Sequence, residues 1–120
     1  MIVDDNPAVL RAAGGLLETQ GLAVAGVATT GDEALSLMRE LEPDVMLVDI
    51  DLGPESGFDV ARRLAPWLDS TGSCVILIST HDETDYAKLI EASPAIGFLS
   101  KSELSAASIG RLLARREEGY

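Results

Sequence analysis

The sequence predicts an α/β fold, in which a doubly wound, five-stranded parallel sheet is covered by five helices. Short apolar runs alternate with amphipathic stretches along the whole chain. Hydrophobic residues make up 47% of the chain but aromatic residues only 4%, as is typical of parallel sheets with Val-, Ile- and Leu-rich cores. The connections between the elements are short, which favours consecutive right-handed strand–helix–strand units.

Five apolar runs are expected to form the strands of this sheet. In chain order they are Met1–Val3, Leu22–Ala28, Val45–Val48, Val75–Ile78 and Ile96–Leu99. We expect the strand order 2-1-3-4-5, the order of flavodoxin-like sheets, which places the first and third strands side by side at the switch point.

Five amphipathic stretches are expected to form the helices. They begin near Pro7, Thr30, Ser56, Thr84 and Leu104. The second should stop before Pro43, the fourth at Ala92 before Pro94, and the fifth near Arg116. The side chains expected to face the core include Val9, Ala13, Leu16 and Leu17 in the first helix, and Ala61, Leu64, Trp67 and Leu68 in the third.

Composition excludes several classes of function. Nine Lys and Arg against twenty Asp and Glu give a net charge of −11, which repels phosphate backbones and argues against direct nucleic-acid binding. The single cysteine, Cys74, excludes an internal disulfide and a cysteine-based zinc site, and its apolar neighbours indicate a buried side chain. No apolar run approaches the ~20 residues of a membrane span and no signal peptide is visible, so a cytoplasmic location without membrane contact is expected.

Polar residues gather where the predicted strands end. The first strand ends in Asp4 and Asp5, the third in Asp49, the fourth in Ser79 and the fifth in Lys101. Ligands of open parallel sheets bind beyond the carboxyl ends of the strands, so these side chains should converge. Each residue alone has a structural explanation, as a turn former, a helix cap or a solvated lysine. The combination of acids, a hydroxyl and a lysine at four strand ends indicates a chemically active site.

The expected acidic cluster predicts a divalent cation. Three carboxylates in one pocket repel one another, and a hard cation relieves the repulsion. Mg²⁺ prefers a few carboxylates together with waters and phosphate oxygens. One carboxylate can then act as a nucleophile toward a phosphoryl group, with Lys101 and the Ser79 hydroxyl stabilising its oxygens.

Five motifs of the chain resemble the receiver domains of two-component response regulators. The acidic opening is Ile2-Val-Asp-Asp-Asn6, the acceptor strand Val45-Met-Leu-Val-Asp49 with the loop glycine Gly57, the hydroxyl strand Ile76-Leu-Ile-Ser79, and the lysine strand Gly97-Phe-Leu-Ser-Lys101. The resemblance covers essentially all of the chain and implies one receiver domain over residues 1–120, with no output domain in this chain.

The resemblance also implies a role for each site residue. Asp49 would accept a phosphoryl group from a histidine of a partner kinase, and Ser79 and Lys101 would contact that group. Mg²⁺ would be held by the Asp5 and Asp49 side chains and by the backbone carbonyl of Asp51. Asp4 would contact it largely through water. Ser79 and Phe98 would form the switch, although Phe98 could also simply fill the core.

The same resemblance implies partners, and the chain also differs from the family pattern at several positions. A covalently linked DNA-binding output domain, absent here, and a homodimer are family-based expectations. Leu52-Gly53-Pro54 replaces the usual Met-Pro after the acceptor strand, Ser102 replaces the proline that often follows the lysine, and Ser93-Pro94 puts the form of the fourth helix in question. His81 is expected to be a solvated loop residue, with an influence on dephosphorylation as the alternative.

Two rival functions remain open. Leu47-Val-Asp-Ile-Asp51 resembles the nucleophile strand of haloacid-dehalogenase-type phosphatases, with Asp51 as general acid. That family places its acidic pair after the lysine, however, whereas Asp4 and Asp5 come first here. The second rival is a phosphorylation-independent interaction module of the same fold.

Overall fold

The computed structural model describes the backbone of residues 1–118 and the side chains of residues 1–115. It contains a five-stranded parallel sheet in the order β2-β1-β3-β6-β7. The strands are β1 (Ile2–Val3), β2 (Val27–Ala28), β3 (Val45–Asp49), β6 (Cys74–Ser79) and β7 (Gly97–Ser100). Taken in chain order these are the first to fifth strands of the sheet, so the order matches the predicted one.

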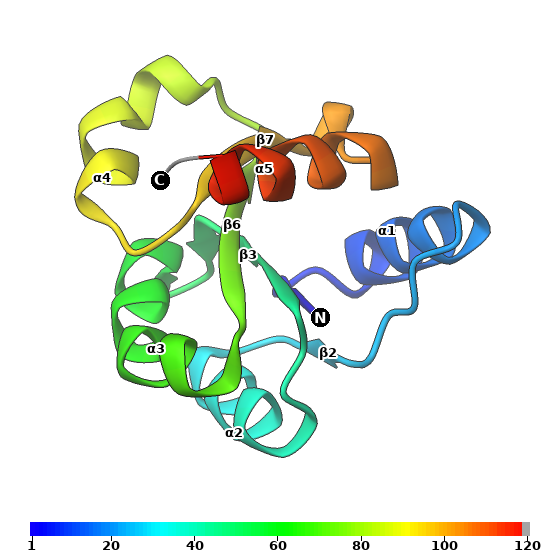
Figure 1. Cartoon of the computed structure of the whole chain (residues 1–120), viewed down its shortest axis with the longest axis horizontal. Coiled ribbons are helices and arrows are strands. Elements are labelled where there is room, and N and C mark those ends of the chain that lie inside the picture. Colours follow the sequence, from blue (N-terminus) through cyan, green and yellow to red (C-terminus); the bar gives the residue numbers. More distant parts are fainter. Residues whose placement is uncertain (119–120) are drawn as a thin grey trace.

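Helices cover both faces of this sheet (Figure 1). They are α1 (Pro7–Thr19), α2 (Gly31–Leu41), α3 (Gly57–Thr71), α4 (Ala87–Ala92) and α5 (Ala106–Glu118). Successive strand residues point to opposite faces, so Leu47 and Ile76 pack with α1 and α5, whereas Val48 and Leu77 pack with α2 and α3. The result is two apolar clusters separated by one sheet.

Polar caps explain where three helices begin. Asn6 accepts a hydrogen bond from the backbone N–H of Ala8 at 3.0 Å, with Pro7 as the first residue of α1. Thr30 accepts one from Glu33 N at 3.2 Å, and Ser56 one from Phe58 N at 3.2 Å. The predicted starts of the first three helices are therefore confirmed.

Three predicted elements are wrong in part. The run Leu22–Ala28 contributes only Val27 and Ala28 to the sheet, because β1 offers just two residues for pairing. The fourth helix is not one element, since a 3₁₀ turn (η1, Glu83–Tyr86) precedes α4. A second 3₁₀ turn (η2, Lys101–Glu103) delays the start of α5 to Ala106, beyond the predicted Leu104.

Two side chains expected in the core are only partly buried. Leu16 is 43% exposed, and Trp67 is 37% exposed, with the Arg39 guanidinium 4.7 Å from its ring centroid. Periodicity identifies the apolar side of a helix but not its edges, where such side chains lie. Cys74, by contrast, is buried as predicted. No helix among the described residues is long and apolar enough to cross a membrane.

A small hairpin follows the third strand and was not predicted. Its strands are β4 (Asp51–Leu52) and β5 (Glu55–Ser56), paired antiparallel. Gly53 turns the chain between them with a φ of +68°, a conformation that favours glycine. The hairpin lies between the end of β3 and the start of α3, and therefore borders the carboxyl edge of the sheet.

Candidate functional site

The carboxyl ends of β1 and β3 bring three acidic side chains together. Val3 pairs with Val48, so Asp4 and Asp49 follow at the same level of two neighbouring strands. Carboxylate oxygens of Asp4, Asp5 and Asp49 all lie within 4.8 Å of one another. Asp4 is fully buried and Asp49 is 4% exposed, whereas Asp5 faces solvent. The predicted convergence of the three aspartates is therefore present.

Lys101 reaches this cluster from the end of β7. Its Nζ lies 2.8 Å from Oδ2 of Asp4 and 3.1 Å from Oδ2 of Asp49. The contact with Asp49 is a hydrogen bond donated by the lysine. Residues far apart in the sequence thus meet because the strands β1, β3 and β7 end at the same edge of the sheet.

Burial and charge shift the protonation of both partners. Desolvation raises the pKa of Asp49 to about 6, because the hydrogen bond from Lys101 offsets only part of the cost of burying the charge. Desolvation acts to lower the pKa of Lys101, but its close contacts with Asp4 and Asp49 outweigh desolvation and raise that pKa above its ordinary value. At neutral pH Lys101 is therefore an ammonium facing the Asp49 carboxylate.

The predicted hydroxyl and aromatic residues lie on the neighbouring strands. Ser79 ends β6 one residue beyond Ile78, which pairs with Asp49, and its buried Oγ accepts the backbone N–H of His81 at 3.0 Å. Phe98 in β7 is 8% exposed and belongs to the apolar cluster on the α2 and α3 face. Phe98 is thus an inward-facing side chain in this structure.

Asp51 and His81 flank the cluster from the solvent side. The backbone N–H of Asp51 donates to Oδ1 of Asp49 at 3.2 Å. The side chain of Asp51 is 71% exposed and points elsewhere, with its Oδ2 3.9 Å from Nε2 of His81. His81 is exposed, as expected, but it also contacts the Tyr86 ring edge-on at 6.0 Å between ring centroids.

The donor set fits a hard divalent cation. Oδ2 of Asp4 is buried and, among the described residues, accepts no well-directed hydrogen bond although the Lys101 ammonium is close. A buried oxygen in this state has coordination capacity left, and its neighbours are two more carboxylates. Mg²⁺ binds through a few carboxylates and keeps several waters, and the exposed Asp5 leaves one side of the cluster open to solvent. The residues present therefore fit the predicted magnesium site.

Comparison with known proteins agrees with this geometry. The response regulator receiver domain family matches residues 1–111, which is nearly the whole chain. This chain belongs to that family. The receiver domain is 35% identical to the transcriptional regulatory protein YvfU of Bacillus subtilis over 101 residues, covering 83% of this chain and 50% of YvfU. It is also 35% identical to the transcriptional regulatory protein KdpE of Mycobacterium tuberculosis, covering 77% of this chain and 39% of KdpE.

Solved structures show the same fold. A two-component response regulator of the LuxR family from Aurantimonas matches with a TM-score of 0.76 and 29% identity, covering 85% of this chain and 72% of that one. A CheY-like receiver domain from Methanospirillum hungatei matches with a TM-score of 0.80 and 21% identity, covering 99% and 95%. The chain spans half or less of the length of the curated relatives that it matches.

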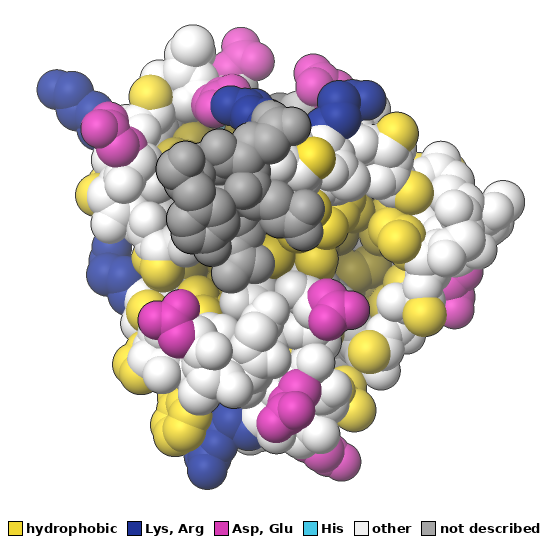
Figure 2. All heavy atoms as spheres, in the orientation of Figure 1, with side chains coloured by type: hydrophobic (Ala, Val, Ile, Leu, Met, Phe, Trp, Pro, Cys, Tyr) yellow, Lys and Arg dark blue, Asp and Glu magenta, His cyan; other side chains and the backbone are white. Residues whose placement is uncertain are grey.

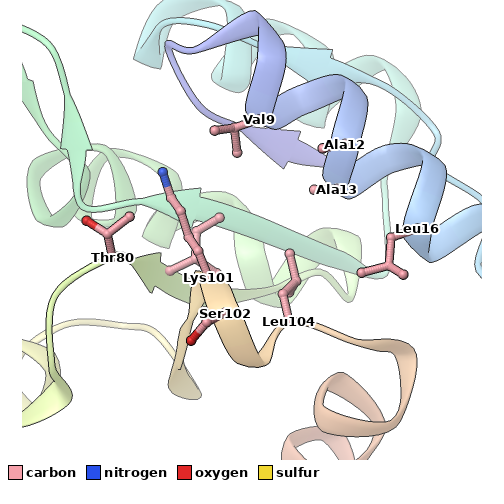
Figure 3. A pocket seen from close by; sticks show the side chains of 9 residues that line it. Val9, Ala12, Ala13, Leu16, Thr80, Lys101, Ser102 and Leu104 are labelled. Carbon is pink, nitrogen blue, oxygen red and sulfur yellow. The ribbon is translucent and has the colours of Figure 1, made fainter.

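An apolar pocket of the receiver domain adjoins Lys101 (Figure 3). Val9, Ala12 and Leu16 of α1 form one wall, and Leu104 forms part of the other. Lys101 lines the same pocket, and its Nζ contacts Asp4 and Asp49 of the acidic cluster. Figure 2 shows further hydrophobic side chains gathered in a hollow between α1 and α5.

Sequence reasoning missed the close packing around the acceptor. A Cβ on Gly57 would overlap the carbonyl oxygen of Asp49 and lie 2.7 Å from Cα of Ile50. A Cβ on Gly53 would lie 3.2 Å from Oδ2 of Asp5. The family resemblance marked Gly57 as a loop glycine but gave no reason for it. Glu55, which joins the hairpin to α2, gave no signal in the sequence.

Proposed function

We propose that this receiver domain accepts a phosphoryl group on Asp49 from a phosphohistidine of a partner kinase, in a reaction that depends on Mg²⁺. The main support for this proposal is the buried Asp49 carboxylate at the end of β3. It lies within 4.8 Å of two further aspartates and accepts a hydrogen bond from the Lys101 ammonium. This arrangement combines a nucleophile with positive charge near the oxygens that become more negative during transfer.

The transfer itself needs positioning more than covalent chemistry. A carboxylate oxygen of Asp49 would attack phosphorus, forming a P–O bond while the N–P bond to the donor imidazole breaks. The bonding pair of that N–P bond returns to the imidazole nitrogen. Lys101 and the Ser79 hydroxyl would each donate a hydrogen bond to a phosphoryl oxygen. When bound by Asp4, Asp5, Asp49 and the carbonyl of Asp51, Mg²⁺ supplies charge stabilisation to the same oxygens.

We further propose that phosphorylation shifts the domain between two conformations. Lys101 now divides its charge between Asp4 and Asp49, and Ser79 accepts from the backbone of His81. A phosphoryl group on Asp49 would compete with these partners for hydrogen bonds from Lys101 and Ser79. The loop after β6 would then favour a second conformation, and Phe98 would change its position with that loop. An equilibrium moved from about 1:99 to 99:1 needs ~5.5 kcal/mol of differential stabilisation.

The partners of this site follow from its surface and from its relatives. We propose that the kinase docks over the apolar pocket lined by Lys101, because Lys101 contacts the Asp49 acceptor. YvfU and KdpE are named transcriptional regulatory proteins and are at least twice as long as the matched region. We therefore propose that the domain controls transcription in the cytoplasm through a linked output domain. Its own charge of −11 argues against its binding DNA directly.

Intact-mass measurement tests the proposal. Wild type and Asp49→Asn are exposed to acetyl phosphate with Mg²⁺ or with a chelator. We expect one added phosphoryl group on wild type with Mg²⁺, little without it, and none on Asp49→Asn. Labelling of Asp49→Asn to the same extent as wild type would refute Asp49 as the acceptor.

A phosphate-release assay with added esters, run beside the labelling experiment, separates the alternatives. A haloacid-dehalogenase-type phosphatase would release phosphate from added esters over many turnovers. A receiver is phosphorylated once, and its phosphoryl group is then hydrolysed slowly. The exposed Asp51 carboxylate points toward His81 and not into the cluster, which argues against its service as general acid. Failure of wild type to be labelled at all would favour the phosphorylation-independent interaction module.

A further inference from the structure

Glu55 joins the β4–β5 hairpin to the start of α2. Its Oε2 accepts the backbone N–H of Gly31, the first residue of that helix, at 2.7 Å. The first N–H groups of a helix have no partner within the helix. Thr30 accepts from the N–H of Glu33, so Glu55 adds a cap from a different part of the chain. The hairpin is thereby attached to the neighbouring helix.

The packing at this junction leaves little freedom. A Cβ on Gly31 would lie 2.9 Å from Nη1 of Arg63 and 3.1 Å from Oε2 of Glu55. Arg63 pairs with Asp32 at 2.5 Å and lies 3.9 Å from Oε1 of Glu55. The Glu55 side chain is 34% exposed, so solvent weakens its ion pair more than its hydrogen bond to the backbone. The hydrogen bond to Gly31 is therefore the principal attachment.

The opposite side of the same hairpin borders the acidic cluster. Leu52 pairs with Glu55 across the hairpin, and Gly53 follows directly. A Cβ on Gly53 would lie 3.2 Å from Oδ2 of Asp5, so the turn packs against that carboxylate. The N–H of Asp51, at the base of the hairpin, donates to Asp49. Two of the three carboxylates thus contact a hairpin that Glu55 anchors.

We propose that Glu55 is a positioning residue for the divalent-cation site. By fixing the hairpin on α2 it keeps the Gly53 turn against Asp5 and the Asp51 backbone beside Asp49. This inference rests on the proposed function only in expecting a cation at the three aspartates. Groups that orient metal ligands without touching the metal typically contribute about 10- to 100-fold to affinity.

Mg²⁺ affinity measured by calorimetry on the full chain tests this role. Glu55→Gln removes the charge but keeps an oxygen that can accept from Gly31, whereas Glu55→Asp keeps the charge but shortens the reach. We expect Glu55→Asp and Glu55→Ala to weaken Mg²⁺ binding about tenfold, and Glu55→Gln to stay close to wild type. Glu40→Ala, an exposed position on α2, serves as the control and should bind as wild type does.

The pattern among the variants distinguishes positioning from other effects. If Glu55 acted only through its negative charge, Glu55→Asp would bind normally and Glu55→Gln would be weak, which would overturn the proposal. If Glu55 only stabilised α2, melting temperatures would fall while Mg²⁺ affinities measured well below them stayed equal, which would overturn it as well. The amide signal of Gly53 in NMR spectra should shift in Glu55→Asp and Glu55→Ala but not in Glu55→Gln.

Failure here is separable from failure of the proposed function. Normal Mg²⁺ binding by wild type without labelling of Asp49 would refute the phosphoacceptor and leave the positioning role intact. Normal labelling with equal affinities in all Glu55 variants would refute the positioning role alone. If wild type bound no Mg²⁺, the positioning role would be overturned directly.

Discussion

The Lys101 ammonium nitrogen lies 2.8 Å from Oδ2 of Asp4, a carboxylate that is fully buried. The same nitrogen donates to Asp49 at 3.1 Å, so one side chain from β7 bridges the ends of β1 and β3. A lysine in this place partly neutralises two acids that would otherwise repel. Its positive charge and that of a divalent cation would compensate the same carboxylates.

Replacement of Lys101 by methionine should therefore strengthen Mg²⁺ binding at pH 8. The variant keeps the aliphatic stem and removes a positive charge that repels the metal and competes for Asp4 and Asp49. We expect an affinity gain on the order of tenfold, which corresponds to about 1.4 kcal/mol, measured by calorimetry. Lys88→Met, on the exposed side of α4, should change it little. Weaker binding by Lys101→Met would mean that the lysine organises the carboxylates more than it competes for them.

The raised pKa of Asp49 makes stability depend on pH. Its pKa in the folded state, about 6, exceeds the ordinary value of 3.8, chiefly because burial disfavours the charge. The corresponding contribution to stability is complete below pH 3.8 and is lost as pH rises through 6. The asparagine of Asp49→Asn cannot ionise, so this variant should not lose stability over the same pH range. Relative to wild type, the variant should gain about 2–3 kcal/mol in unfolding free energy between pH 4 and pH 7.

Urea unfolding in the presence of a chelator measures this difference, because bound metal would stabilise the ionised carboxylate. Asp69→Asn, at an exposed position of α3, provides the comparison. Parallel pH profiles for Asp49→Asn and wild type would show that burial of Asp49 is less costly than the structure indicates.

A methyl group on Gly57 should damage both the fold and the acceptor. The N–H of Gly57 donates to the carbonyl of Ile50 at 2.6 Å, and its Cβ would overlap the Asp49 carbonyl. Backbone atoms cannot rotate away as side chains do. Gly57→Ala should therefore lower the unfolding free energy by roughly 1–3 kcal/mol and slow the labelling of Asp49 by acetyl phosphate.

Gly15→Ala is the matched control for that substitution. Gly15 lies on the exposed side of α1, and a Cβ there meets nothing within 4 Å. Alanine in a helix is favoured over glycine by about 0.5–1 kcal/mol. This variant should gain stability and label normally, and a loss comparable to that of Gly57→Ala would contradict the packing argument.

Truncation of two residues in α3 should separate its buried side from its exposed edge. Leu64 is fully buried, and Leu64→Ala should cost about 2–5 kcal/mol through lost burial and a residual cavity. Trp67 is 37% exposed and contacts Arg39, so Trp67→Ala should cost only roughly 1–2 kcal/mol despite its size. Denaturant unfolding followed by circular dichroism compares them, and the reverse order would contradict the burial assigned to this helix.

Local signals in the sequence predicted most of the fold. The order of apolar runs and the caps at Asn6, Thr30 and Ser56 placed the strands and the first three helix starts, because capping and periodicity depend on neighbouring residues. The length of β2 was overestimated, since an apolar run does not reveal how many partner residues the adjacent strand provides. The exposure of Trp67 likewise depends on which helix lies beside it.

The residues that end the strands can be identified from the sequence alone. Because parallel strands align their carboxyl ends, Asp4, Asp5, Asp49 and Lys101 were therefore expected to meet, as they do. Three features are visible only in the folded chain: Lys101 contacts both Asp4 and Asp49, Gly57 packs tightly on Asp49, and Glu55 caps α2. Those relationships are contacts across distant parts of the chain. They depend on the exact packing of these groups against one another, for which no residue pattern along the sequence provides a signal.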